Sequence, residues 1–199
     1  MSRVSTGKAL LWALLSIPAL PLLYRWLTDP ELWVADLLHP TGEWSARLII
    51  VALMLTPLSQ AFPRAPAVKL LLRHRRAFGV AAFSYALLHL LFYVLDMETV
   101  ANMLAEIGAP AIWTAWLAFL LLVPVALTSN DASMRALRAG WKKLQRLAYP
   151  AAVLTLAHWL LVHDGKAAAL LHFAPLAALQ LYRLARLARP KPITQRSMT

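Results

Sequence analysis

Two histidines, His89 and His158, are the residues of this sequence best suited to chemistry, because each lies inside a long apolar stretch. The stretch around the first begins with paired cations at Arg75, continues for about twenty residues with almost no charge and ends on the carboxylate of Asp96. An imidazole surrounded by hydrocarbon needs a hydrogen-bonding neighbour, water or a metal, and titratable groups inside a membrane are functional candidates by default. Since neutral imidazole is also a common metal ligand, both histidines are candidate ligands.

Helix geometry places the two histidines at the same depth in a membrane. His89 lies about 20 Å along a helix axis beyond Arg76 and about 10 Å short of the carboxylate that ends its run. His158 lies about 18 Å beyond Arg146 and about 9 Å short of the next carboxylate. Two imidazoles at one level on two parallel helices can serve as both axial ligands of a b-type haem. The alternative is that each histidine packs against a neighbouring helix through a hydrogen bond, and the matched depth favours the haem.

The helical faces around both histidines suit a flat cofactor, because small residues leave room for it and aromatic or branched ones form walls. The positions three, four and seven residues away, which share a face with each histidine, are Ala82, Tyr85, Ala86, Phe92 and Tyr93 in one helix and Ala151, Leu154, Thr155, Leu161 and Val162 in the other. Among them, Tyr85 and Thr155 are candidate hydrogen-bond partners of the second ring nitrogens.

Three further histidines lie in or near the same half of the membrane. His172 is about 9 Å into the last apolar run and level with the pair. It could replace a ligand or contact a haem propionate, although a structural or hydrogen-bonding role is favoured. His39 and His163 are expected near the outer surface, in the company of solvent or a partner protein.

The composition identifies an integral membrane protein. Of the 199 residues, 60% are hydrophobic and 15% charged, and the mean hydropathy is +0.60, which is too apolar for an ordinary soluble domain. The net charge of +11 could indicate nucleic acid, but the cations fall in short segments between apolar runs, as in membrane proteins, so we expect no nucleic-acid binding. The absence of cysteine excludes disulfides, thiolate nucleophiles and iron–sulfur clusters.

Six apolar runs have about the length that a bilayer requires, and each is read as a helix because a lone strand leaves its backbone groups unpaired in lipid. They cover residues 9–27, 46–62, 78–95, 110–128, 147–163 and 167–184. Cations and carboxylates gather in alternate connections, so the positive-inside rule places both termini in the cytoplasm. Arg75 and Arg76 then lie on the cytoplasmic side, where anionic lipid is favoured over a haem propionate or a flavin phosphate as their partner. The sequence predicts an all-α membrane bundle of six transmembrane helices.

The runs form a single domain over residues 1–189, followed by a polar tail, residues 190–199, that is expected to be disordered and cytoplasmic. The first run resembles a signal peptide but lacks a clear cleavage site, so we expect an uncleaved span. After the fourth run, an apolar stripe at helical spacing alternates with cations and predicts one amphipathic helix on the cytoplasmic leaflet, capped by Ser129, Asn130 or Asp131. A solvated basic linker is the alternative. The stripe consists of Met134, Leu137, Trp141 and Leu144.

Several segments together resemble the haem-binding membrane subunit of the bacterial periplasmic methionine sulfoxide reductase system, within the ferric-reductase-like transmembrane superfamily. These are TPL at 56–58, RRAFGVAAFSYALLHLLFYVLD at 75–96, ALTSN at 126–130, WKKLQRLAY at 141–149 and AHW around His158. They occur in the family's order over about residues 40–165. The resemblance implies His89 and His158 as axial ligands of haem b, and it also implies a bound flavin, FMN.

One residue departs from the family pattern. The family has a histidine in W-x-x-L-H-R-L-x-Y, thought to help hold haem on the cytoplasmic side, whereas this chain has Gln145 there. Glutamine is a poor ligand of haem iron, and thirteen residues, about 20 Å of helix, separate it from His158. We therefore expect one haem b rather than two, and FMN is implied by the resemblance alone.

The resemblance further implies electron transfer across the bacterial inner membrane. Electrons would come from the quinone pool or a cytoplasmic flavin reductase and leave to a periplasmic molybdopterin enzyme that reduces methionine sulfoxide. No catalytic carboxylate pair or nucleophile is recognisable, so we expect an electron-transfer subunit rather than a catalytic chain by itself. The alternative is a stand-alone transmembrane ferric or quinone reductase. A haem-free scaffold or transporter is disfavoured, since transporters carry broken helices or polar residues at the membrane midplane.

Overall fold

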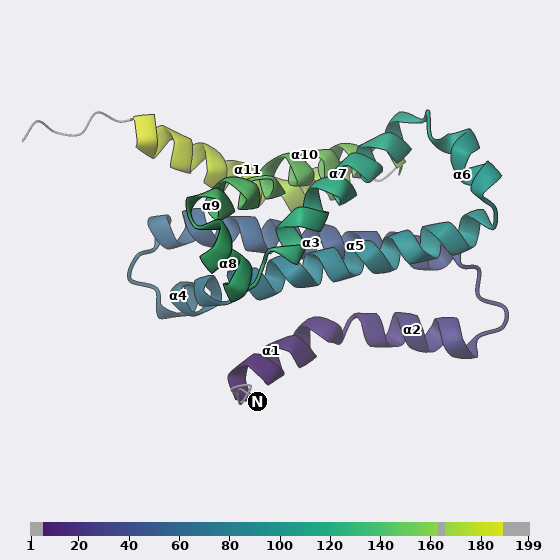
Figure 1. Cartoon of the computed structure of the whole chain (residues 1–199), viewed down its shortest axis with the longest axis horizontal. Helices are drawn as coiled ribbons and strands as arrows, with labels where there is room; N and C mark the ends of the chain where they lie inside the picture. Colours follow the sequence, from purple (N-terminus) through teal and green to yellow (C-terminus); the bar gives the residue numbers. More distant parts are fainter. Residues whose placement is uncertain (1–5, 163–165, 189–199) are drawn as a thin grey trace, which may run out of the picture.

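The computed structural model describes residues 6–162 and 166–188, and every regular element within these ranges is a helix (Figure 1). The prediction of an all-α membrane protein is confirmed to this extent. The helices in chain order are α1 (Thr6–Ser16), α2 (Ala19–Thr28), α3 (Ala35–Ala61), α4 (Pro66–Arg73), α5 (Arg75–Met97), α6 (Val100–Glu106), α7 (Pro110–Leu127), α8 (Asp131–Leu137), α9 (Ala139–Gln145), α10 (Ala148–Val162) and α11 (Lys166–Ala188).

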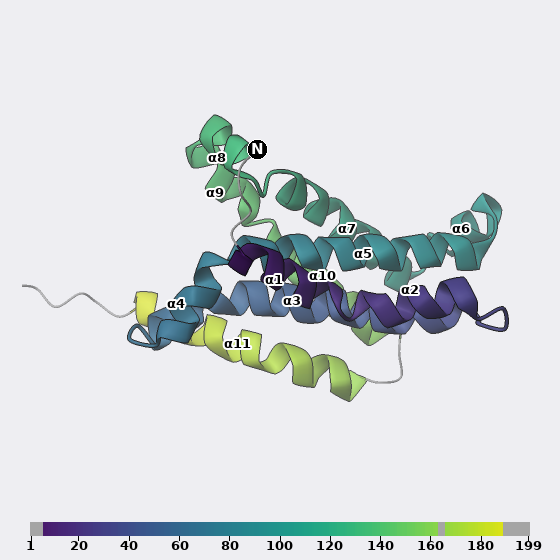
Figure 2. The same cartoon turned by 90° about the horizontal axis from the view of Figure 1, so that it is seen from below.

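Helices α3 and α5 form the centre of the molecule and lie side by side along their length (Figures 1 and 2). Helices α7 and α10 pack against each other, α7 also contacts α5, and α10 also contacts α3. Helix α11 contacts α3 and α10, while the α1–α2 segment lies along the other flank of α5. The site predicted from the sequence therefore involves α5 and α10, two helices that α3 and α7 hold together.

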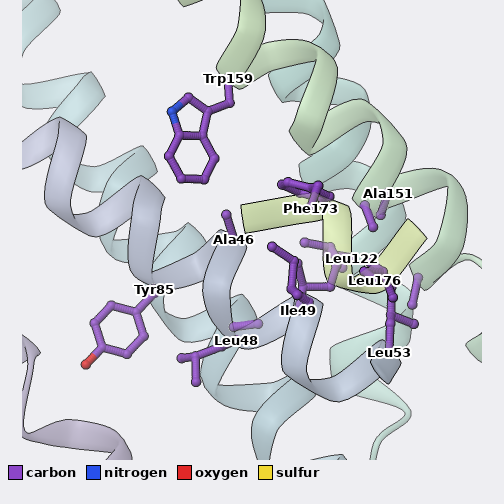
Figure 3. Packing of buried hydrophobic residues seen from close by; sticks show 14 of the residues in the cluster. Ala46, Leu48, Ile49, Leu53, Tyr85, Leu122, Ala151, Trp159, Phe173 and Leu176 are labelled. Atoms are coloured by element: carbon purple, nitrogen blue, oxygen red, sulfur yellow. The ribbon is translucent and has the colours of Figure 1, made fainter. Parts of the chain in front are cut away.

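The core lies where α3, α5, α7, α10 and α11 converge, and Figure 3 shows part of it. Helix α3 contributes large side chains such as Ile49 and Leu53, and α5 and α10 contribute small ones such as Ala82 and Ala151 as well as aromatic ones. Within a membrane, small residues let helix backbones approach closely, which favours packing without a hydrophobic driving force. The outer surface is rich in exposed leucines, as expected where lipid replaces water.

In the part of the chain that the structure describes, four helices are long and apolar enough to cross a membrane, namely α3, α5, α7 and α11. Helices α1 and α2 together would form a fifth span. The two are bent by 51° relative to each other at a break that contains Pro18. Proline has no N–H to donate and therefore interrupts a helix. Helix α10 has 15 residues, about 22 Å, which is shorter than the hydrocarbon core of about 30 Å. The count of six spans remains a prediction.

Helix α3 is longer than the sequence predicts. Helix α3 begins at Ala35, eleven residues before the predicted run, so the acidic stretch after Asp36 is helical rather than a loop. Its charged side chains pair at helical spacing, because Glu43 lies within 3.5 Å of His39 and 2.7 Å of Arg47, each four residues away. These polar pairs continue the helix beyond its apolar part.

The single amphipathic helix expected after the fourth run is instead two short helices, α8 and α9. They break at Arg138, whose backbone adopts φ +47° and ψ −119°. The break lets Trp141 turn back and donate its ring N–H to the carbonyl of Thr128 at 2.9 Å. Among the predicted capping residues, Asn130 is the cap, since its side chain accepts from the backbone N–H of Ser133.

The first described residues of α1 and the last of α11 lie toward the same end of the bundle as α4, α8 and α9 (Figures 1 and 2). The predictions for His163, for the carboxylate that follows it and for the tail at 190–199 concern segments outside the described residues.

Candidate functional site

The structure brings His89 and His158 together. His89 from α5 and His158 from α10 have ring centroids 6.1 Å apart, with the ring planes at 73° to each other. Metal–imidazole nitrogen bonds are about 2 Å long and each ring centroid lies about 1 Å behind its nitrogen, so rings on opposite sides of one iron have centroids about 6 Å apart. The spacing of the two rings therefore fits one iron between them.

A cavity lies between α3, α5, α7 and α10, and both histidines line it. Most of the other lining side chains are apolar, including Leu90 from α5 and Ile112 and Phe119 from α7. Such a lining keeps water away from the rings and lowers the local dielectric, which is the environment that tunes a metal centre. The cavity thus suits an apolar, flat cofactor.

Both histidines use the same ring nitrogen to anchor themselves on another helix. The Nδ1 atom of His89 lies 2.9 Å from the carbonyl oxygen of Leu38 in α3, and Nδ1 of His158 lies 2.8 Å from the carbonyl oxygen of Ala111 in α7. A carbonyl oxygen can only accept, so Nδ1 carries the proton in each ring. The lone pair then resides on Nε2, and metal-ligating histidines usually donate their other N–H in this way.

The donor set fits haem better than a bare metal ion. Within residues 6–162 and 166–188, no group of three or more His, Asp or Glu side chains is close enough together to hold a metal. A structural zinc site takes four protein ligands. Two imidazoles are enough for haem, because the porphyrin supplies the remaining nitrogens.

Gly42 of α3 faces the ring of His89 directly. A Cβ atom at position 42 would lie 3.1 Å from Cε1 and 3.2 Å from Nδ1 of His89, closer than ordinary van der Waals contact. The missing side chain allows the imidazole to lie against the backbone of α3 and to reach the Leu38 carbonyl. Gly42 is therefore part of the site.

Tyr93 adds a polar group to the cavity. Tyr93 lies one helical turn beyond His89, and its buried hydroxyl is the side-chain polar atom for which no hydrogen-bond partner is found among the described residues. Buried hydroxyls are normally paired. An acceptor from a bound cofactor, such as a carboxylate, would satisfy this one.

Tyr85 and Thr155, the two residues predicted to bond to the histidine rings, donate their hydroxyls to backbone carbonyls instead. Thr155 lines the cavity, but its hydroxyl donates to the carbonyl of Ala151 in its own helix. Tyr85 lies on another face of α5 and donates to the carbonyl of Leu15 in α1. Backbone carbonyls thus take the role of histidine partner that was expected of Tyr85 and Thr155, because α3 and α7 approach the rings more closely.

His172 lies behind the cavity wall. Its ring is 5.2 Å from that of Trp159, which lines the cavity, and its Nε2 accepts from the guanidinium of Arg47 at 3.3 Å. Arg47 in turn donates to Glu43, so the network continues to His39 and the edge of the cavity. The hydrogen bonds of His172 agree with the structural role that the sequence favoured.

Arg75 and Arg76 lie at the opposite end of α5, about 20 Å from the histidine level. Arg75 donates to the hydroxyl of Thr56 at 3.2 Å, and Arg76 forms an ion pair with Asp131 at 2.6 Å. The hydrogen bond and charge of Arg76 hold the pKa of the Asp131 carboxyl below its usual range. Arg76 therefore ties α5 to α8, and both arginines are too far from the cavity to contact a propionate there.

Gln145, the departure from the family pattern, has a structural role. Its side-chain amide donates to the carbonyl of Val125 at 3.0 Å and lies 3.3 Å from the hydroxyl of Thr128. These contacts fasten the end of α9 to the end of α7.

Sequence reasoning missed Gly42 and assigned His39 and Glu43 to an outer loop, although all three line the cavity. The spacing of His39, Glu43 and Arg47 at four-residue intervals was the available signal, since it is typical of a helix. The carbonyls of Leu38 and Ala111 carried no signal, because every residue has a carbonyl.

Comparison with models of known protein families shows which class of protein this chain belongs to. Residues 41–156 match the family model described as "Ferric reductase like transmembrane component". This segment includes α5 with His89 and all of α7, and it ends within α10 two residues before His158. No solved structure shows a significant match to the chain.

The similar curated proteins narrow the class. One is the "Protein-methionine-sulfoxide reductase heme-binding subunit MsrQ" of Xanthomonas campestris pv. campestris (strain 8004), 39% identical over 153 residues, 74% of this chain and 67% of the relative. The protein of the same name from Xanthomonas axonopodis pv. citri (strain 306) is 35% identical over 177 residues, covering 82% and 79%. That from Brucella ovis is 39% identical over 152 residues, covering 74% and 67%. The chain therefore belongs to the MsrQ family of ferric reductase-like transmembrane proteins.

Proposed function

We propose that this chain is an electron-transfer subunit of the bacterial inner membrane, in which His89 and His158 hold the iron of a single haem b. The observation that carries the proposal is the pair of imidazole rings whose centroids lie 6.1 Å apart, each with Nδ1 bonded to a carbonyl of a neighbouring helix. When bound, haem b supplies reversible one-electron transfer. Similarity to the heme-binding subunits named above supports the same cofactor.

The chain's own residues perform three tasks in this proposal. The carbonyls of Leu38 and Ala111 fix the tautomer of the rings and increase the basicity of Nε2. The apolar side chains of α5 and α7 exclude water from the iron-binding position. The hydroxyl of Tyr93 is available to a carboxylate of the cofactor at the end of the cavity nearer Asp96.

The charge pattern supports electron flow toward the periplasm. The cavity lies toward the end of the bundle that carries Asp96, Glu98 and the acidic side chains before α3, which the positive-inside rule assigns to the periplasm. A haem at this level is well placed to pass electrons outward. We propose that they go to a periplasmic molybdopterin methionine sulfoxide reductase and come from the quinone pool or a cytoplasmic flavin reductase.

The cytoplasmic end is proposed to contact lipid and solvent. Arg75, Arg76 and the cations of α8 and α9 lie at the end where both described chain ends gather, which supports cytoplasmic termini and an anionic leaflet as their neighbour. FMN, which only the resemblance implies, would bind on this side. Gln145 makes hydrogen bonds within the protein there, which supports one haem rather than two.

The test is purification of the full chain in detergent, followed by reduced-minus-oxidised absorbance spectra and haem quantification. We expect a low-spin b-type spectrum with one haem per chain. His89→Ala and His158→Ala should each abolish this spectrum, whereas Gln145→Ala should retain it. Wild-type spectra in both histidine variants would refute the ligand assignment.

The alternative function, a stand-alone ferric or quinone reductase, differs from the proposed one in the molecule that accepts the electrons. Haem reduced in the purified protein should be reoxidised by the periplasmic partner and not by a ferric chelate. Rapid oxidation by the ferric chelate or by a quinone alone would favour the alternative.

A further inference from the structure

The two carbonyls that hold the histidine rings share a second feature. The residue three positions after Leu38 is Thr41, and the residue three positions after Ala111 is Thr114. The hydroxyl of Thr41 lies 3.0 Å from the Leu38 carbonyl oxygen, and that of Thr114 lies 2.8 Å from the Ala111 carbonyl oxygen. Each acceptor of an imidazole proton is therefore also approached by a threonine hydroxyl.

Both threonines are buried, in contrast to most polar residues of the chain. Thr41 is 0% exposed and Thr114 is 4% exposed. Each hydroxyl is also close to the carbonyl four residues earlier, at 2.6 Å from Leu37 and 2.7 Å from Pro110. The single hydroxyl proton is thus shared between two carbonyls, an arrangement that threonine commonly adopts in helices. What is particular here is that one carbonyl of each pair also binds a ring nitrogen.

A carbonyl oxygen that receives two donors gives less electron density to each. The hydroxyl proton of the threonine therefore limits the strength of the Nδ1–H···O bond to the histidine. A stronger bond at Nδ1 makes the imidazole a better electron donor through Nε2, which stabilises oxidised iron. The threonine hydroxyl accordingly favours the reduced state of a metal that the histidine binds.

We propose that Thr41 and Thr114 are matched positioning residues, which share the carbonyls that hold His89 and His158 and so raise the reduction potential of the iron between them. This inference rests on the proposed function, because it concerns haem iron. It extends that function by assigning the control of potential to two residues that act through the carbonyls of Leu38 and Ala111.

The two threonines are not fully equivalent. The oxygen of Thr41 lies 3.4 Å from Nδ1 of His89, so it can also accept weakly from the ring. Removing it takes away a competing donor and a weak acceptor at once, and the two effects oppose each other. The hydroxyl of Thr114 donates to the carbonyls of Pro110 and Ala111, so its removal takes away a competing donor and gives the larger change.

The experiment uses the haem-loaded full chain in detergent and measures the midpoint potential by spectroelectrochemical titration. Thr114→Val, which keeps the shape and removes the hydroxyl, should lower the potential. We expect about a threefold change in the reduction equilibrium, which corresponds to about 28 mV for one electron. Thr41→Val should shift it less in the same direction, and the double variant should show the sum, because the sites lie on different helices.

Two controls separate this effect from loss of packing. Thr128→Val removes a hydroxyl that bonds to the carbonyl of Pro124 in α7, about 20 Å along the helix from Thr114 and outside the cavity lining, so the potential should stay at the wild-type value. Thr114→Ser restores the hydroxyl without the methyl group and should return the potential toward wild type. If packing alone set the potential, it would instead change in Thr114→Ser, which lacks the methyl group, and stay unchanged in Thr114→Val, which keeps it.

An unchanged or higher potential in Thr114→Val, with one haem bound, would overturn this inference and leave the proposed function intact. Equal shifts in Thr128→Val and Thr114→Val would overturn it as well. A wild-type protein that binds no haem would overturn the proposed function, and the inference with it.

Discussion

At the scale of single residues, the absence of a side chain at position 42 is as important as the histidines themselves. Gly42 lies inside α3, where alanine would ordinarily stabilise the helix by about 1 kcal/mol. Its hydrogen atoms leave the space that the ring of His89 occupies. At this position helix stability therefore favours alanine, whereas the position of the His89 ring requires glycine.

Gly42→Ala should weaken haem binding. The added Cβ would press on a ring that is held by the Leu38 carbonyl, and overpacking of this kind costs about 1–3 kcal/mol. Haem affinity should fall roughly fivefold or more. The measurement is a haem titration of the apo-protein, together with its thermal unfolding.

Gly79→Ala provides the matched control, because a Cβ at position 79 of α5 meets nothing within 4 Å. It should gain helix stability and keep wild-type haem affinity. If Gly42→Ala binds haem as tightly as Gly79→Ala, the close approach of α3 to the ring is unimportant.

At the scale of helices, the break between α8 and α9 stores strain at a residue poorly suited to it. Arg138 adopts φ +47°, in the region that favours glycine, and non-glycine residues held there cost about 1–3 kcal/mol. Arg138→Gly should relieve this strain, partly offset by the greater freedom of glycine in the unfolded chain. We expect a net gain of about 1 kcal/mol, or roughly 2–4 °C in thermal unfolding.

Arg135→Gly tests this explanation, because it removes the same charge from the interior of α8, where the backbone is helical. Glycine in a helix interior is unfavourable, so this variant should unfold at a lower temperature than wild type. A rise in both variants would indicate that loss of positive charge, rather than strain, is responsible.

The helices illustrate what apolar periodicity can and cannot predict. It located α5, α7 and α11 to within a few residues, because lipid demands long apolar runs. It placed the start of α3 too late, since the part around Glu43 is held by charge pairs within the protein rather than by lipid. It also missed the break at Arg138, because a backbone conformation that is unfavourable for arginine leaves no trace in hydropathy.

At the scale of the whole molecule, the cavity joins four helices that are far apart in the sequence. A ligand that contacts α3, α5, α7 and α10 at once should stabilise the whole bundle, because it binds the folded state and not the unfolded one. At a free haem concentration one hundred times the dissociation constant, the gain is about 2.7 kcal/mol. Thermal unfolding of the apo-protein should then rise by roughly 5–10 °C on addition of haem.

His158→Ala is the control for this measurement. It removes one ligand from α10 and should abolish the rise. A similar rise in this variant would show that haem stabilises the detergent-solubilised protein through nonspecific partitioning rather than through the cavity.

The candidate site shows the same division between what sequence can and cannot reveal. Counting residues from the charged ends of two helices was enough to place His89 and His158 at one level, because helical rise is constant. The role of Gly42 and the interior position of Glu43 depend on which face of α3 turns toward α5. That rotation is set by packing of the finished bundle.

The anchoring of the rings on main-chain oxygens has a consequence for how such proteins diverge. Any amino acid at positions 38 and 111 offers the same oxygen, so a change of side chain at either position leaves the anchor of the imidazole in place. Searches for pairs of positions that change together would find nothing linking 38 to 89 or 111 to 158. What such lineages cannot tolerate is a one-residue insertion or deletion in α3 or α7 just after the carbonyl, which would rotate the needed oxygen by about 100° relative to the packed body of its helix.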